Sequence, residues 1–219
     1  MLQTKRMARA PSICGVVLAA GASTRMGSDK ALLPWPPATS ARAQHTFLAA
    51  QIEALQRSTD LVIVVTGANS KRLEPLIYAA GGFLVQNPTP EGGQFSSLQT
   101  GLRDVLGRGR DAAMVALVDR PPALPATVNR LREAFLEHVE RGYWAVVPEY
   151  GGRHGHPVAI GREMISAFLA ALPTATAREV EHANQSRVAY VKVDDPRICL
   201  NVDTPQDYAR LVSERAGER

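Results

Sequence analysis

The stretch GVVLAAGASTRMGSDK, residues 15–30, decides the fold. Its residues 16–18 form a short, apolar, β-branched run, which is typical of a strand buried in a parallel sheet. The run ends in the small residues 19–23, and a ligand such as phosphate can closely approach the backbone amides of small residues. Arg25 and Lys30 follow. The pattern predicts either a polyphosphate-binding loop or a strand followed by a tight turn with two solvated bases.

The common phosphate-binding motifs are absent from this stretch. The sequence contains neither GxxxxGK[ST] nor GxGxxG after the first predicted strand. The stretch therefore argues against a P-loop NTPase and against an ordinary dinucleotide-binding site.

Residues 18–35, LAAGASTRMGSDKALLPW, resemble the signature LAAGxSxRMGxxKxLLP. That signature belongs to the MobA-like nucleotidyltransferases, which attach a nucleotide to molybdopterin, and to relatives that act on sugar or polyol phosphates. The resemblance implies a single-domain, Rossmann-like nucleotidyltransferase fold, also called the nucleotide-diphospho-sugar transferase fold. It further implies that the nucleotide and its triphosphate are bound by Leu18, Ala19, Ala20, Gly21, Arg25 and Lys30, the last two as catalytic residues.

Length and composition favour one globular domain. The chain has 219 residues, of which 45% are hydrophobic and 21% charged, and it can bury one full core. No apolar run approaches the roughly 18 residues that span a bilayer, and the basic N-terminus lacks the apolar region of a secretory signal. We expect residues 1–11 to be a flexible tail and residues 12–219 to be the nucleotidyltransferase domain.

Charge and cysteine content exclude several classes of partner and site. The net charge of +4 arises from 25 basic and 21 acidic residues that are scattered along the chain, without a dense basic run. Nucleic acid and membrane are therefore not expected partners. Cys14 and Cys199 each lie in a strand-like run without metal-ligand spacing, so we expect two buried, inert thiols in a reducing, cytoplasmic setting.

Strand-like and helix-like segments alternate along the whole chain. This alternation predicts an α/β domain with a mostly parallel sheet and helices on both faces. A breaker is expected at 35–40. The expected strands after the first are 61–65, 83–86, 112–118, 144–148, 158–160 and 188–193. The expected helices are 43–57, a segment from 70 to 80, one that begins within 87–102, and 127–141, 163–172 and 176–184. A last helix is expected to begin at Thr204, with Asp207 three residues later as in a capping box.

Two aspartates are candidate metal ligands. Asp119 follows the apolar run 112–118, and its residue type and position alone fit a metal ligand or a helix-capping acid equally well. The resemblance favours the metal, because the family has a magnesium-binding aspartate in a segment like ALVDxPxL, and it makes Asp119 a third catalytic residue beside Arg25 and Lys30. It also assigns a second ligand to Asp203, in the ending [DN]-[IV]-[DN]-T-P-E-D. We expect both acids to end strands at one sheet edge and to repel each other without metal.

The segment 87–102, NPTPEGGQFSSLQTGL, begins as a Pro/Gly loop and continues as a helix. Ser96 and Ser97 lie at the expected helix start, where hydroxyl groups cap free amides. The resemblance adds a serine-rich EGxSSSL turn that closes over the nucleotide, which makes Ser97 a nucleotide-binding residue. Gln94 and Phe95 depart from the small residues of that turn.

A second turn contains His154 and His156, two residues apart. No cysteine, aspartate or third histidine lies nearby in the sequence, which argues against zinc. In the family a G-x-x-G-H-P-V turn faces the acceptor substrate, so the resemblance makes Gly155 and His156 substrate-binding residues, with His154 incidental.

The implied reaction is nucleotidyl transfer with Mg²⁺ as cofactor. The family splits by nucleotide, and LAAG at residues 18–21 resembles the members that use CTP, with molybdopterin as the favoured acceptor. A sugar or polyol phosphate is the alternative acceptor. A non-catalytic chaperone that binds nucleotide or cofactor is the alternative from another class of protein. The resemblance also implies a further partner, a molybdoenzyme that receives the product.

Overall fold

The computed structural model describes residues 10–36 and 45–216. Most of the expected tail 1–11, the end of the breaker (37–40) and the first two residues of the expected helix 43–57 lie outside the described residues. None of the helices in the described ranges has the length and apolar character that crossing a membrane requires.

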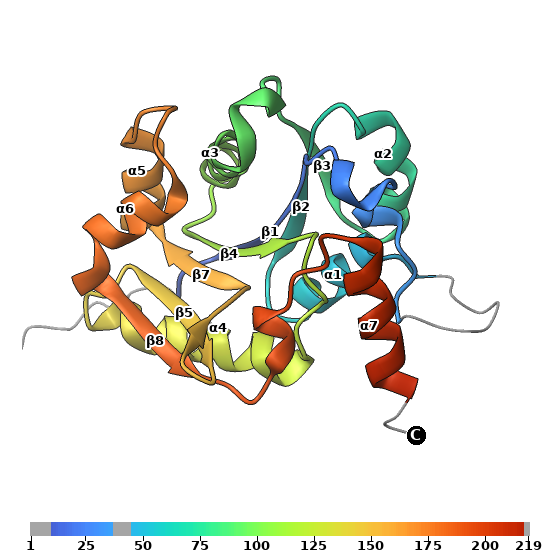
Figure 1. The fold of residues 1–219 in the computed structure, drawn as a ribbon. Coiled ribbons are helices and arrows are strands. Elements are labelled where there is room, and N and C mark those ends of the chain that lie inside the picture. The colour runs from blue at the N-terminus through green and yellow to red at the C-terminus, as the bar shows by residue number, and fades with distance from the viewer. Residues whose placement is uncertain (1–9, 37–44, 217–219) are drawn as a thin grey trace, which may run out of the picture.

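Eight strands form one sheet, which is the centre of the fold (Figure 1). The strand order is β3-β2-β1-β4-β7-β5-β6, and β8 pairs with β5. The bounds are β1 Ile13–Ala19, β2 Leu61–Thr66, β3 Phe83–Gln86, β4 Ala112–Leu117, β5 Ala145–Tyr150, β6 Arg153–His154, β7 Val158–Gly161 and β8 Val188–Lys192. The predicted α/β class and single domain are confirmed.

Most of the strand pairs are parallel, but β7 runs antiparallel to both β4 and β5. The sequence pattern does not reveal this reversal. Its cause is the short connection between Tyr150 and Val158, which is shorter than the dozen or more residues that a parallel crossover needs. The chain therefore turns back through β6, which pairs antiparallel with β5.

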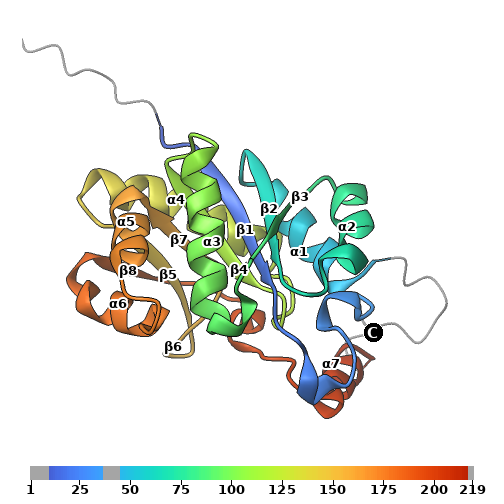
Figure 2. The same ribbon diagram turned by 90° about the horizontal axis from the view of Figure 1, so that it is seen from above.

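Helices cover both faces of the sheet, as predicted (Figure 2). The helices are α1 Phe47–Gln56, α2 Ser70–Ala79, α3 Gly93–Gly107, α4 Pro125–Glu140, α5 Arg162–Ala170, α6 Ala177–Ala183 and α7 Pro205–Ala216. One face packs against α1, α2 and α4, and the other packs against α3, α5 and α6.

Strand β1 lies between the two cores, and its side chains alternate between them. Ile13 and Val17 pack into the core that contains α1, whereas Val16 and Leu18 pack into the core that contains α3. Helix α3 approaches closely at Gly101, where an added Cβ would lie 2.8 Å from a methyl group of Val65. This double burial explains why residues 16–18 are apolar without alternation.

One local prediction is wrong. Cys199 is buried, as expected, but it ends a 3-10 turn, Pro196–Cys199, and not a strand. Asp195 starts this turn by accepting a hydrogen bond from the amide of Arg197 at 3.1 Å, and Pro196 occupies the first position of the turn. Asp203 therefore follows a turn and an extended loop, whereas a strand was expected.

Candidate active site

The loop after β1 is held in place by its own polar side chains. Ser23 has a left-handed backbone (φ 51°), and its hydroxyl accepts a hydrogen bond from the amide of Lys30 at 3.1 Å. Asp29 starts the 3-10 turn Lys30–Leu32 by accepting from the amide of Ala31 at 3.1 Å. The side chain of Asn69 donates to the other oxygen of Asp29 at 3.0 Å and so ties the loop to the start of α2.

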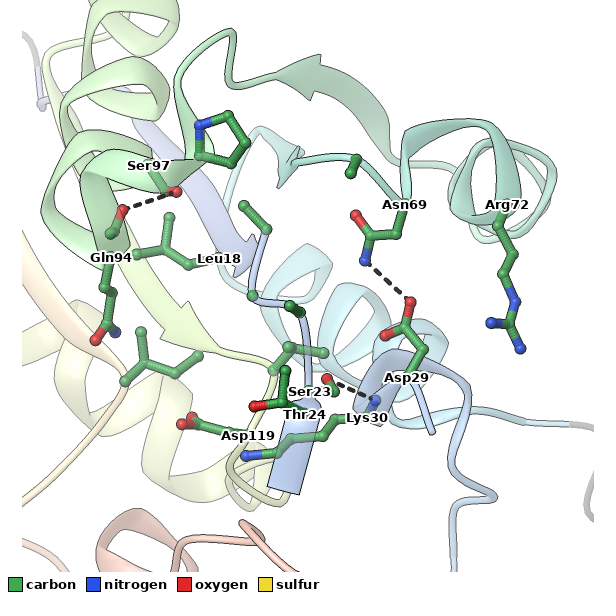
Figure 3. A pocket seen from close by; sticks show the side chains of 18 of the residues that line it. Leu18, Ser23, Thr24, Asp29, Lys30, Asn69, Arg72, Gln94, Ser97 and Asp119 are labelled. Carbon is green, nitrogen blue, oxygen red and sulfur yellow. Dashed lines mark hydrogen bonds between the residues drawn. The ribbon is translucent and has the colours of Figure 1, made fainter. Parts of the chain in front are cut away.

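A pocket of ≈ 1110 Å³ opens at the carboxyl ends of β1, β2 and β4 (Figure 3). This position fits the general rule that open α/β sheets bind ligands where their parallel strands end. Of the residues expected to bind nucleotide or metal, Leu18, Ala20, Gly21, Lys30, Ser97 and Asp119 line the pocket. Ala19, Arg25, Asp203, Gly155 and His156 are not among its lining residues.

Lys30 connects the loop to the far end of the chain. Its ammonium group lies 2.5 Å from a carboxylate oxygen of Asp203, and the guanidinium of Arg25 lies 3.2 Å from the same oxygen. The two cations differ in environment, because the Lys30 side chain is 10% exposed and the Arg25 side chain is 70% exposed. The expected repulsion between free carboxylates is therefore absent at Asp203, which two cations neutralise.

Asp119 lies beside this ion pair, on the loop after β4. Its backbone carbonyl accepts a hydrogen bond from the amide of Val202 at 2.8 Å, which brings the segment before Asp203 alongside it. One oxygen of its carboxylate is buried and has no hydrogen-bond partner among the described residues. Figure 3 shows Lys30 and Asp119 pointing into the same part of the pocket.

A divalent cation fits these residues. No cluster of three histidine, cysteine, aspartate or glutamate side chains suited to a metal occurs within residues 10–36 and 45–216. Mg²⁺ is commonly held by one or two carboxylates together with water and substrate phosphates. Asp119 has an unpartnered carboxylate oxygen, and Asp203 follows Val202, whose amide is bonded to the Asp119 carbonyl. Together the two carboxylates meet that requirement.

The serines at the start of α3 do not cap its amides as expected. The hydroxyl of Ser96 donates to the carbonyl of Gly93 at 2.9 Å, and that of Ser97 donates to the same carbonyl at 3.4 Å. Both hydroxyls accept from the buried amide of Asn87, at 2.9 and 3.0 Å. Serine bonding back to a preceding carbonyl is a common alternative to capping. Asn87 is a residue that sequence reasoning missed, although its place directly after β3 is a usable signal.

The turn with Gly155 and His156 packs against the 3-10 turn Pro196–Cys199. The amide of His156 donates to the carbonyl of Ile198 at 3.1 Å. A Cβ on Gly155 would lie 2.2 Å from that carbonyl oxygen, so only glycine fits there. Burial, reinforced by the charge of Arg120, lowers the pKa of His156 to about 3. The imidazole is therefore neutral at physiological pH, and its buried Nδ1 has no hydrogen-bond partner among the described residues.

Polar residues at the start of α2 also line the pocket, and sequence reasoning did not select them. Asn69, Lys71 and Arg72 all belong to its lining (Figure 3). Their position in the sequence could have identified them, because they follow the end of the parallel strand β2, where ligands bind in such sheets. Lys71 and Arg72 add positive charge to a site that already contains Lys30.

The chain matches the family described as MobA-like NTP transferase domain over residues 15–188. Among curated proteins it is 27% identical to a probable molybdenum cofactor guanylyltransferase of Mycobacterium avium, over 96% of this chain and 100% of that protein. It is 24% identical to the molybdenum cofactor cytidylyltransferase of Escherichia coli, over 88% of this chain and 92% of that protein. It is 28% identical to the nicotine blue oxidoreductase of Paenarthrobacter nicotinovorans, over 92% of this chain and 97% of that protein.

Among solved structures, the crystal structure of Rv0371c from Mycobacterium tuberculosis superposes with a TM-score of 0.77 at 27% identity. The superposition covers 94% of this chain and 100% of the Rv0371c chain. A structure of Rv0371c in complex with manganese superposes with a TM-score of 0.69 at 24% identity, over 92% of this chain and 98% of that chain. The match over residues 15–188, together with the pocket at the ends of β1, β2 and β4, shows that this chain belongs to the MobA-like NTP transferase family.

Proposed function

We propose that this protein transfers CMP from CTP onto the phosphate of molybdopterin and releases pyrophosphate. The proposal rests on Lys30 and Asp119, which line one ≈ 1110 Å³ pocket, and on Asp203, which forms an ion pair with Lys30 beside it. A triphosphate needs its charge neutralised before a second polyanion can approach it. Cations and metal-ligating carboxylates on one sheet edge meet that need.

The reaction consists of one displacement at phosphorus. An oxygen of the acceptor phosphate forms a bond to the α-phosphorus, the bond from that phosphorus to the bridging oxygen breaks, and pyrophosphate leaves with the electron pair. A phosphomonoester with a second pKa of about 6 is mostly a dianion at neutral pH, so no residue has to remove a proton. This fits the pocket, which offers cations and carboxylates but no histidine among its lining residues.

Each residue has one role in this proposal. Lys30 and Arg25 would bind the triphosphate, and Asp119 and Asp203 would hold Mg²⁺, which supplies further charge neutralisation when it is bound. The amides of residues 19–21 would hold the nucleotide, with Ser97 as a further residue in the pocket lining. When Lys30 binds phosphate, its ion pair with Asp203 weakens, which frees that carboxylate for the metal.

The choice of CTP rests on Ala20. Ala20 and Pro90 both line the pocket, and Gly67 lies against both of them, since a Cβ on Gly67 would lie 2.8 Å from the Ala20 carbonyl and 3.1 Å from the ring of Pro90. A methyl group on Ala20 that narrows this part of the pocket would favour the smaller pyrimidine over guanine. One relative named above is a probable guanylyltransferase and another is a cytidylyltransferase. The preference for CTP over GTP is therefore a quantity to measure on this protein.

Pyrophosphate release separates the candidate functions. The protein is incubated with each of the four NTPs and Mg²⁺, with and without molybdopterin, and with a panel of sugar and polyol phosphates. We expect release with CTP that depends on molybdopterin. Release only with a sugar or polyol phosphate would support the alternative acceptor. No release in any arm, together with tight CTP binding, would support a non-catalytic binding protein. Because one relative is an oxidoreductase, NADH consumption is followed in parallel and is expected to be absent.

A further inference from the structure

Three buried polar atoms without hydrogen-bond partners lie in one region of the protein. In the described residues, four buried side-chain nitrogen or oxygen atoms have no partner. Apart from the Nε of Arg110, they are one carboxylate oxygen of Asp119, the Nε of Arg120 and the Nδ1 of His156. Buried polar groups without partners are rare in native proteins, so a cluster of them calls for an explanation.

The segment 198–202 brings these residues together. The carbonyl of Ile198 accepts hydrogen bonds from the Nη1 of Arg120 at 2.7 Å and from the amide of His156 at 3.1 Å. Four residues later, the amide of Val202 donates to the carbonyl of Asp119. Asp119, Arg120 and His156 therefore surround one short piece of chain.

A second arginine adds positive charge to this cluster. Arg153, on β6, donates from its Nη2 to the carbonyl of Cys199 at 3.0 Å, one residue beyond the carbonyl that Arg120 uses. Neither Arg120 nor Arg153 forms an ion pair with a carboxylate among the described residues. Both guanidinium groups are thus held on backbone carbonyls, with donors left over and no carboxylate at ion-pair distance, although the charges of Asp119 and Asp203 act on Arg120 from farther away.

The cluster lies outside the nucleotide pocket but shares Asp119 with it. Asp119 lines that pocket, whereas Arg120, Arg153 and His156 do not. Asp203 does not neutralise the arginines by contact, because its oxygen is bound by Lys30 and Arg25. An anion bound here would lie next to Asp119 but outside the set of residues that line the nucleotide pocket.

We infer that Arg120 and Arg153 bind the phosphomonoester group of the acceptor and so restrict the enzyme to acceptors that carry one. This inference rests on the proposed function. A guanidinium has a planar fork of donors that matches a phosphate, and charge-assisted hydrogen bonds of this kind are the strong ones. The neutral imidazole of His156, whose amide shares the Ile198 carbonyl with Arg120, would add one unpartnered nitrogen to the same site.

This position suits the proposed reaction. Nucleophile and leaving group lie roughly in line at the phosphorus, so the acceptor phosphate and the pyrophosphate must be on opposite sides of it. Lys30 and Asp119 line the nucleotide pocket, whereas Arg120, the next residue in the chain, is not among the lining residues and donates to the carbonyl of Ile198. Holding the acceptor phosphate on Arg120 and Arg153 would place its oxygen for attack without the loss of orientation that a free acceptor suffers.

Binding of inorganic phosphate tests the inference without turnover. The protein is first saturated with a non-hydrolysable CTP analogue and Mg²⁺, so that the triphosphate site is filled, and phosphate is then titrated by calorimetry at pH 7.5. We expect Arg120→Gln and Arg153→Gln each to weaken phosphate binding about 10-fold or more, because each loses a charge-assisted hydrogen bond. Arg120→Lys keeps the charge without the fork and is expected to lie between the wild type and Arg120→Gln.

Arg197→Gln is the matched control. It removes one arginine charge from the 3-10 turn to which Arg120 and Arg153 donate, but Arg197 itself lies over the ring of Trp35, 5.8 Å from its centroid. We expect it to leave phosphate binding unchanged. If Arg120→Gln does not fold, Arg153→Gln alone carries the test, because Arg153 is exposed. Absence of phosphate binding in the wild type, or equal binding in the wild type and both arginine variants, would overturn the inference.

Steady-state kinetics separate this inference from the proposed function. We expect both arginine variants to raise the KM for the acceptor and to leave the KM for CTP within about twofold of the wild type. If the wild type shows no transfer to any acceptor yet its phosphate binding depends on Arg120, the proposed function fails and the anion site stands. If transfer occurs but neither variant changes the acceptor KM, the anion site fails and the proposed function stands.

Discussion

Lys30 and Asp203 are 173 residues apart in the chain, yet the ammonium of one lies 2.5 Å from the carboxylate of the other. The contact closes the loop after β1 against the segment that leads into α7. It is largely buried, since the Lys30 side chain is 10% exposed and that of Asp203 is 23% exposed. One contact thus links a proposed triphosphate-binding residue to a proposed metal ligand.

Lys30→Met should reduce turnover strongly and destabilise the protein moderately. It keeps the buried methylene groups and removes the charge, so we expect a loss of about 100-fold or more in kcat/KM. Because the partner Asp203 retains only the exposed Arg25, we also expect a lower free energy of unfolding, by about 1–3 kcal/mol. Kinetics and denaturant unfolding measure the two effects. The control is Lys71→Met, which removes an exposed pocket lysine; an equal loss in that variant would contradict a special role for Lys30.

The two proposed metal ligands should differ in their effect on stability. Asp119→Asn replaces a carboxylate that has a buried, unpartnered oxygen, so the metal-free protein should be as stable as the wild type or more so. Asp203→Asn removes the partner of Lys30 and Arg25, so the metal-free protein should unfold at a lower temperature.

Both aspartate variants should nevertheless need more Mg²⁺ and turn over more slowly at saturating CTP. Asp203→Asn should be the milder change in turnover, because an amide oxygen can still bind the metal. Thermal melts in EDTA and Mg²⁺ titrations of activity measure these effects. Wild-type turnover and Mg²⁺ dependence in both variants would mean that the carboxylates are only structural.

The sequence was sufficient to predict the layered fold and most element positions. Buried parallel strands such as Leu61–Thr66 are apolar on both faces, and the helix start at Thr204 has its own polar signature: Asp207 accepts from the Thr204 amide at 2.9 Å. These features depend on local chemistry, which the order of residues records directly. The antiparallel β7 and the turn at Cys199 depend on long-range pairing and were not predicted.

The candidate site was predictable in part for the same reason. Lys30 and Asp119 follow strands of the parallel sheet, so their meeting follows from strand order. Arg120 and Arg153 are 33 positions apart and meet only because both donate to the turn Pro196–Cys199. No periodicity or spacing in the sequence records that shared partner.

His156 should make the stability of the protein depend on pH. The unfolded chain takes up a proton at this residue below about pH 6.5, whereas in the folded protein its pKa is lowered to about 3. Between these values the unfolded state binds more protons, so the free energy of unfolding falls as the pH falls. His156→Gln should flatten this dependence between pH 7.5 and 5, measured by urea unfolding. The control is His182→Gln, which removes an exposed imidazole; if it flattened the dependence as much as His156→Gln, buried His156 would not be the cause.

Ala20 should influence which nucleotide base the protein prefers. If the methyl group of Ala20 narrows the part of the pocket that it lines together with Pro90, calorimetric titration with Mg²⁺ should show tighter binding of CTP than of GTP. Ala20→Gly removes only that methyl group from a half-buried loop position, so folding should be unaffected while GTP binding improves relative to CTP. Ala22→Gly, which also lies in the pocket-lining loop, controls for added backbone freedom, and its preference should match that of the wild type. Equal affinities in the wild type, or a preference for GTP, would rule out the cytidine assignment and leave the fold and the phosphate-binding residues untouched. A CTP preference that persists in Ala20→Gly would instead place base selection on another part of the wall.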